Sequence, residues 1–263
     1  MISGLKSYMS EMWEYRYFWT QLVRSDLQKR YRRSILGLGW SLLQPLAMTA
    51  VLSLVYSRVL KMDFGSFAPM LLTGLAFWGL IQSSSVQGCG CFIAAEPFIR
   101  QQPLPTVIFS LRIVLTSGFH FLIALTLAVL MAGTNLGGVS PALITLIPSL
   151  LLLFVFAWSL ATILAYCHVY FPDTQHLAEV ALQVFMYLTP IVYPPSLLEQ
   201  NGLWFLLEFN PLALILQLIR DPILAGHCPT LWAYAKVGIF VIPLGALAIM
   251  TVAKLERRLI FAM

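Results

Sequence analysis

The chain has 263 residues, of which 59% are hydrophobic and only 10% are charged, and its formal net charge at pH 7 is +5. A water-soluble globular protein needs more charged side chains than this to cover its surface. The composition therefore excludes that class and indicates an integral membrane protein. The alternating strands of a membrane barrel are absent, whereas several apolar stretches suit helices that cross about 30 Å of hydrocarbon. The sequence therefore predicts an all-α integral membrane protein with six transmembrane helices.

Residues 1–33 predict an amphipathic helix in the cytoplasmic interface of the membrane. Its apolar side chains recur at spacings of three and four, and the stripe consists of Leu5, Tyr8, Met9, Met12, Tyr15, Trp19, Leu22 and Val23. An orientation anchor and a docking surface for a partner protein both account for such a helix. Because Glu11, Glu14 and Asp26 interrupt this region, we expect no cleavable signal peptide.

Gaps between charged residues place five spans within residues 35–193 and a sixth before the tail at 254–263. The spans are expected at about 35–57, 68–93, 177–193 and 232–253, with two more inside the region 113–172. That region contains no Asp, Glu, Lys or Arg, and its two spans form a hairpin that turns at 134–138, where Asn and Gly gather.

The basic residues predict the orientation of the chain. An even number of spans puts both termini on one side, and assigning that side to the cytoplasm places most Lys and Arg side chains inside. Only Arg58, Lys61, Arg220 and, at the edge, Lys236 then lie outside. The positive net charge is thus a topology signal, and we expect no nucleic-acid partner.

Residues 194–229 predict an extracytoplasmic gate region before the last span. Two apolar pieces, 203–207 and 212–219, are each too short to cross the hydrocarbon. We expect them to dip into the protein and return, because non-helical backbone at membrane depth needs protein or water around it. A loop lying on the outer surface is the alternative.

No catalytic, metal or nucleotide motif stands out. The four histidines are spread over different segments without the spacing of metal ligands, and no phosphate-binding GxxxxGK[ST] loop occurs. We therefore expect no enzyme and no cofactor in this chain, so any use of ATP belongs to another subunit.

Short motifs in a fixed order carry a family resemblance. The run DLQKRYRRSILGLGW at 26–40, with Pro45 behind it, resembles the entry of type-2 ABC exporter permeases that move bacterial polysaccharides. FPD at 171–173, TPIVYP at 189–194, NPL at 210–212 and Arg220-Asp221 are similar to the same family in order and spacing. The resemblance covers nearly the whole chain.

This resemblance implies a half-transporter in the bacterial inner membrane with both termini in the cytoplasm. Two copies would assemble as a homodimer with two copies of an ATPase subunit that holds ATP and Mg. The cargo would be a lipid-linked polysaccharide such as O-antigen, capsule or teichoic acid. The family's ATPase-coupling helix maps onto Glu96, Pro97, Phe98, Ile99 and Arg100, and Pro97 and Pro103 independently favour a short helix between them. A plain connector is the alternative.

A glycan channel needs surfaces that bind sugar weakly, which aromatic rings and a few polar groups provide. The candidates are Trp40, Phe77, Trp78, Gln82, Ser85, Tyr166, Tyr170, Phe185, Tyr187 and Tyr193. Core packing, lipid contact and hydrogen bonds between helices are the alternatives for these residues.

Three arginines at the inner headgroup level, Arg30, Arg32 and Arg33, are candidates for binding a lipid diphosphate, because guanidinium groups pair well with phosphate oxygens. Attraction to anionic membrane lipids explains them equally well. For the whole chain, a type-2 permease for a drug or another lipid and an ATP-independent transporter remain alternative functions.

Overall fold

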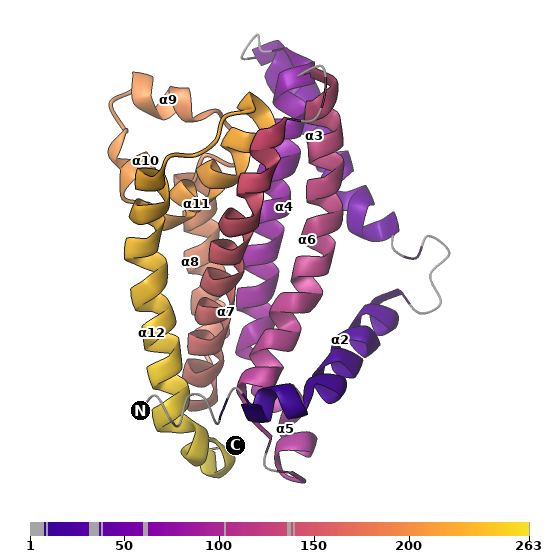
Figure 1. Ribbon diagram of the computed structural model, residues 1–263, viewed down its shortest axis with the longest axis vertical. Coiled ribbons are helices and arrows are strands. Elements are labelled where there is room, and N and C mark those ends of the chain that lie inside the picture. The colour runs from indigo at the N-terminus through magenta and orange to yellow at the C-terminus, as the bar shows by residue number, and fades with distance from the viewer. Residues whose placement is uncertain are drawn as a thin grey trace.

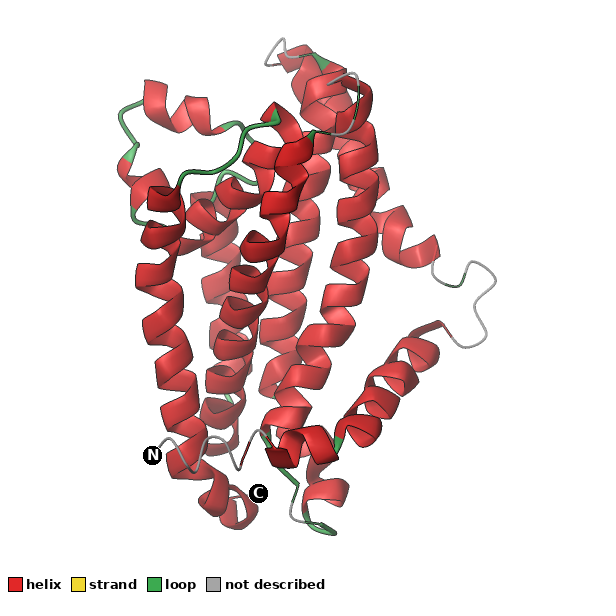
Figure 2. Cartoon of the chain, in the orientation of Figure 1, coloured by secondary structure: helices red, strands yellow, loops and turns green. Residues whose placement is uncertain are grey.

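The computed structural model describes residues 8, 10–31, 37, 39–59, 63–102, 104–135, 138 and 140–262. Within these ranges every regular element is helical and no strand occurs (Figure 2). The α-helices are α2 (Arg16–Tyr31), α3 (Gly39–Val59), α4 (Phe64–Cys89), α5 (Cys91–Ile99), α6 (Val107–Asn135), α7 (Leu146–Tyr170), α8 (Thr174–Leu188), α9 (Pro195–Gln200), α10 (Phe205–Glu208), α11 (Pro211–Arg220) and α12 (Leu231–Ala262). A 3₁₀ turn, η1 (Pro141–Thr145), precedes α7, and a π-helical turn, η2 (Asp221–Ala225), follows α11.

Five of the described helical segments are long and apolar enough to cross a membrane. They are Leu42–Val59, Phe64–Cys89, Val107–Thr134, Pro141–Tyr170 and Leu231–Glu256. They match the predicted first, second, third, fourth and sixth spans, including the hairpin between α6 and α7. Helices are the expected outcome, because hydrocarbon offers no water to satisfy backbone polar groups.

The fifth predicted span, 177–193, is wrong at its end. Helix α8 has 15 residues, which corresponds to about 22 Å at a rise of about 1.5 Å per residue. Thr189 has extended backbone angles of φ −99° and ψ 133°, because a residue before proline is kept out of the helical region by Pro190. The chain therefore leaves the helix five residues before the expected boundary.

The last helix also differs from the prediction. The tail expected at 254–263 is helical to Ala262 and continues α12 without a break. Leu255 and Leu259 explain this extension, because they pack against the apolar cluster beneath α5 and α7.

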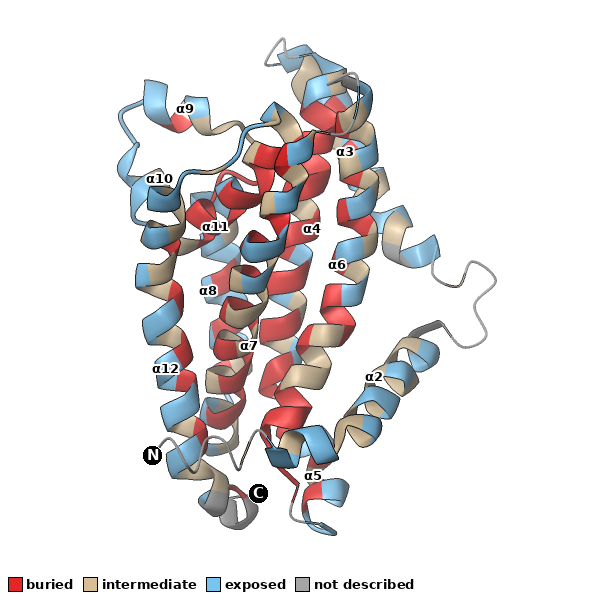
Figure 3. Cartoon of the chain, viewed as in Figure 1, coloured by how far each residue is buried: buried red, intermediate tan, exposed pale blue. Residues whose placement is uncertain are grey.

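Helix α4 forms the centre of the bundle. It packs against α3, α6, α7 and α8, and 17 of its 26 residues are buried, as Figure 3 shows along most of its length. Gly88 permits close approach to α7, since a Cβ atom there would lie 3.0 Å from the Cβ of Ala161. Small residues bring membrane helices together in this way.

The two ends of the bundle carry different elements (Figure 1). Helices α2 and α5 and the C-terminal end of α12 lie at one end, whereas α9, α10, α11 and the start of α12 lie towards the other. The segments predicted as cytoplasmic and as the gate region are therefore on opposite ends. Helix α11 packs against α4, α7 and α12, so the second apolar piece of the predicted gate does enter the bundle.

Candidate functional sites at the two ends of the bundle

Helix α5 and its C-cap residue Arg100 carry the predicted coupling residues, but the bounds of the helix differ from the prediction. It starts at Cys91, directly after a break at Gly90, so Pro97 lies inside the helix and not at its first position. The exposed face presents Pro97, Phe98 and the ion pair between Arg100 Nε and Glu96 Oε1 at 2.7 Å. Ile99 is only 5% exposed and packs inward with Phe92. Four of the five candidates thus share an accessible surface.

A polar junction joins distant parts of the chain behind α5. Oε1 of Glu256 accepts hydrogen bonds from the Tyr8 hydroxyl at 2.7 Å and from the backbone N–H and the hydroxyl of Thr106 at 2.8 and 2.9 Å. The hydroxyls of Thr106 and Tyr166 lie 2.7 Å apart. Burial and the Glu256 carboxylate raise the pKa of Tyr8, which keeps its hydroxyl protonated. We call these four residues the Glu256 junction.

The N-terminal segment is docked on the protein at this end, but the single helix predicted for it is interrupted by a turn at Tyr15, after which α2 begins. Tyr8, Met12, Tyr15 and Leu22 pack against the same cluster as α5, which confirms the stripe for these members. Leu5 and Met9 lie outside the described residues. Phe18, which the stripe did not include, meets Phe98 of α5 edge to face, with ring centroids 5.8 Å apart.

Two sets of contacts here were not predicted. The Arg112 guanidinium of α6 donates to both carboxylate oxygens of Asp26 in α2, and each side chain is less than a fifth exposed. This ion pair and the Glu256 junction connect residues far apart in sequence. In the sequence, each of these contacts is signalled only by a charged residue at the edge of an apolar segment, and no pattern indicates which residue that charge contacts.

The basic candidates for lipid diphosphate are almost entirely outside the described part of the chain. Arg30 lies in the last turn of α2, and nothing is described of its side chain. Arg32 and Arg33 fall outside the described residues.

The channel candidates do not form one surface in the described chain. Phe77, Trp78 and Ser85 of α4 and Tyr166 of α7 are at most 4% exposed, so they lie within the protein. Trp40, Gln82, Tyr170, Phe185 and Tyr187 are exposed, and Tyr193 is partly buried. Of these, Tyr187 and Tyr193 are brought together, because the Tyr193 hydroxyl donates to the Tyr187 carbonyl at 2.7 Å.

Helix α4 carries a run of polar side chains at 82–87, and some of them form hydrogen bonds with a neighbouring helix. The hydroxyls of Ser83 and Ser117 of α6 lie 3.0 Å apart, and Gln87 donates to Ser83 at 2.8 Å. Gln82 stays exposed on the open flank of α4, whereas the buried hydroxyl of Ser85 has no partner among the described residues.

At the other end, Arg220 fixes α11 to the bundle. Its side chain is buried at the end of α11, and Nη2 donates to the carbonyls of Met70 and Ile191, each at 2.9 Å. Nη1 donates to the carbonyl of Pro190. One guanidinium therefore ties together α4, the turn after α8 and α11.

The start of α11 is fixed as well. The Asn210 side chain accepts from the N–H groups of Leu212 and Ala213 and donates to the Thr189 hydroxyl at 2.9 Å. An N-cap asparagine followed by Pro211 is a strong signal for a helix start.

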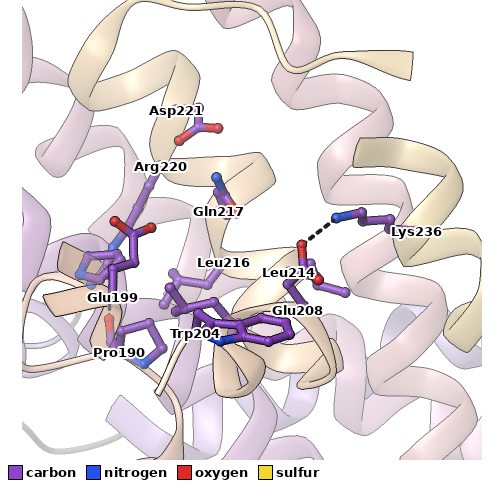
Figure 4. A pocket seen from close by; sticks show the side chains of 13 residues that line it. Pro190, Glu199, Trp204, Glu208, Leu214, Leu216, Gln217, Arg220, Asp221 and Lys236 are labelled. Atoms are coloured by element: carbon purple, nitrogen blue, oxygen red, sulfur yellow. Dashed lines mark hydrogen bonds and ion pairs between the residues drawn. The ribbon is translucent and has the colours of Figure 1, made fainter. Parts of the chain in front are cut away.

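A cavity of about 400 Å³ lies beside α11 (Figure 4). It is lined from the turn after α8 and from α9, the α10 segment, α11, η2 and α12. The polar side chains in its wall are Glu199, Trp204, Glu208, Gln217, Arg220, Asp221 and Lys236. Lys236 Nζ and Glu208 Oε1 form an ion pair at 3.1 Å that joins α12 to α10.

Comparison with known proteins agrees with this architecture. Residues 17–224 match the ABC-2 type transporter family. The chain is 26% identical over 208 residues to the O-antigen export system permease protein RfbA of Klebsiella pneumoniae, covering 78% of this chain and 79% of that protein. It is 27% identical over 204 residues to the protein of the same name from Myxococcus xanthus, covering 77% and 78%. The chain is therefore a multi-pass membrane permease that belongs to the ABC-2 type transporter family.

Proposed function

We propose that the chain is the membrane-spanning subunit of an ATP-driven exporter that moves a lipid-linked polysaccharide across the bacterial inner membrane. The observation that carries this proposal is the similarity to two permeases named for O-antigen export over more than three quarters of the chain. The distribution of basic residues supports cytoplasmic positions for both termini.

The end of the bundle with α5 is the surface on which an ATPase subunit would act. Phe98 is 38% exposed beside Glu96 and Arg100, which gives an apolar contact with charged neighbours. Apolar anchors with a polar rim are typical of protein interfaces. ATP and Mg would be held by that partner, in two copies for two copies of this chain.

A second copy of the chain would cover the apolar flank beside α4. Only 11% of the spanning part of α3 is buried, and α8 also exposes large apolar side chains, among them Val184 and Phe185. The glycan path in the proposed homodimer would be lined by the exposed candidates Trp40, Gln82, Tyr170, Phe185 and Tyr187. In this arrangement α8 and the non-helical turn that follows it together form the fifth crossing, which brings the total to six.

Arg30, Arg32 and Arg33 would meet the lipid diphosphate of the cargo at the cytoplasmic headgroup level. A guanidinium group offers two parallel donors to phosphate oxygens, which suits such a role.

Deleting the gene in its host tests the function. The proposal predicts that surface polysaccharide is lost and that lipid-linked glycan accumulates in the inner membrane. Restoring the chain should restore export only when the partner ATPase is catalytically intact. Normal surface polysaccharide after deletion would contradict the proposal, and accumulation of a different lipid or a drug would favour a permease for that cargo.

A further inference from the structure

The cavity beside α11 has the chemical lining of a carbohydrate site. Its volume of about 400 Å³ falls within the usual range for small-molecule sites and suits one or two sugar rings. We propose that this cavity, formed by the gate helices and α12, binds a neutral hexopyranose unit of the exported glycan. The inference rests on the proposed function for the identity of the cargo, and on the cavity itself for the chemistry.

An aromatic ring supplies the stacking surface. Trp204 is 54% exposed, and its indole lies between the Glu199 and Glu208 side chains in the view of Figure 4. Leu207 and Leu214 add apolar wall beside it. A pyranose presents C–H groups on its ring faces and hydroxyls around its edge, so it fits an apolar face ringed by polar groups.

The polar groups of the wall are suited to hydroxyls. Carboxylate oxygens at Glu199 and Asp221 can accept hydrogen bonds, and the Gln217 amide, which hydrogen-bonds to Asp221, can both donate and accept. No ion pair involves Glu199 among the described residues. Nε of Arg220 has no partner in the described part of the chain, but this atom is fully buried, so it lies behind the wall and outside the reach of a ligand. A sugar hydroxyl can satisfy the carboxylates and the amide.

The charges argue for a neutral ligand. Three carboxylates, at Glu199, Glu208 and Asp221, line the cavity with two cations. Lys236 already pairs with Glu208, and the Arg220 guanidinium donates to three backbone carbonyls. A phosphate or a uronic acid would therefore meet uncompensated negative charge.

Saturation-transfer NMR on the full chain in lipid nanodiscs tests the proposal, because this method detects weak ligands. The probes are the methyl glycosides of glucose, galactose, mannose, rhamnose and N-acetylglucosamine, with methyl glucuronide as the anionic comparison. We expect transfer to at least one neutral glycoside. Trp204→Ala should weaken that binding about fivefold or more, because it removes the stacking surface.

Trp232→Ala is the matched control, since Trp232 is 66% exposed at the start of α12 and does not line the cavity. It should leave glycoside binding unchanged. If Trp204→Ala fails to fold, Gln217→Ala, on the exposed flank of α11, should show the same loss. Glu199→Gln combined with Asp221→Asn should improve binding of the glucuronide.

Absence of transfer to every neutral glycoside, equal binding in the Trp204→Ala and Trp232→Ala variants, or preference of the native chain for the glucuronide would each overturn the site. These outcomes are separate from the gene-deletion test. Export that depends on the chain, without glycoside binding, would remove the cavity site and leave the proposed function standing. Glycoside binding without any effect of deletion on surface polysaccharide would contradict the proposed function and leave the cavity site standing.

Discussion

The guanidinium of Arg220 occupies the space that a side chain at Gly74 would need. A Cβ atom at Gly74 would lie 2.8 Å from the carbonyl oxygen of Ile191 and would collide with Nη2 of Arg220. That same nitrogen donates to Ile191 and to Met70, so α4, α11 and the turn after α8 meet at one tight contact. The absence of a side chain at Gly74 is thus what allows a buried arginine to hold α11 and the turn after α8 against α4.

Gly74→Ala should destabilise the protein by about 1–3 kcal/mol, the usual cost of overpacking a tight site. The measurement is the thermal unfolding midpoint of the purified protein in detergent. Gly79→Ala, in the same helix, is the control, because a Cβ there meets nothing within 4 Å. It should be neutral or stabilising by up to about 1 kcal/mol through helix propensity. Equal effects of both changes would contradict the packing role of Gly74.

Arg220→Met should destabilise the protein on the order of 3 kcal/mol, because buried carbonyls lose charged donors and cannot regain water. Arg220→Lys keeps a charge but lacks the planar fork that reaches several carbonyls together. The stability of this variant should therefore lie between those of the native protein and of the Met variant. Thermal unfolding and protease cleavage between residues 194 and 210 measure the effect. A fully stable Met variant would show that these hydrogen bonds do not hold α11 in place.

Tyr8→Phe should cost about 1 kcal/mol at neutral pH by removing the donor to Glu256. The pKa of Tyr8 is raised in the folded protein, so its contribution is full below the unfolded pKa of about 10 and declines as pH rises through the folded value. The stability difference between native and Tyr8→Phe should therefore shrink above about pH 10. Tyr17→Phe, where the ring is 73% exposed, should show no such difference at any pH.

Asp26 and Arg112 should show an interaction energy of about 1–3 kcal/mol in a double-mutant cycle, because their side chains are largely buried. Asp26→Asn and Arg112→Gln would each weaken the docking of α2 on α6. Their combination should cost less than the sum of the two. Simple additivity in thermal unfolding would indicate that the ion pair contributes nothing measurable.

Phe98→Ala should weaken association with the ATPase subunit about tenfold or more, as expected for an apolar anchor at an interface. The fold should persist, because Phe98 is 38% exposed. Co-purification and ATPase activity of the mixed subunits provide the measurement. Phe64→Ala is the control, because α4 begins with Phe64 at the opposite end of the bundle (Figure 1) and this residue is 50% exposed. It should leave both readings unchanged.

Long apolar segments were predictable because hydrocarbon leaves the backbone only helical solutions. The hairpin of α6 and α7 follows directly from the charge-free region 113–172. The end of α8 was missed although Pro190 was visible, since the restriction on Thr189 competed with a continuous apolar run. The start of α5 was predicted wrongly, because proline favours the first position of a helix but is also tolerated near its end, as Pro97 is here. Gly90 interrupts the helix only briefly, so α5 begins directly after it.

The site residues were less predictable for a physical reason. In a membrane protein both the lipid-facing and the buried faces of a helix are apolar. No periodicity in the sequence therefore distinguishes the buried Phe77 from the exposed Phe185. The partners of Glu256 lie 150 and 248 residues away, and no local pattern reveals such contacts. Arg220 stood out as a charge beside an apolar piece, but its carbonyl partners come from separate segments.

The central claim is most directly tested by reconstituting the chain with its ATPase subunit in vesicles that contain lipid-linked glycan. The account predicts that glycan crosses the bilayer only when both subunits and ATP are present, and that hydrolysis by the ATPase depends on this chain. Glycan movement with the chain alone, or hydrolysis that is indifferent to the chain and to the glycan, would contradict the account.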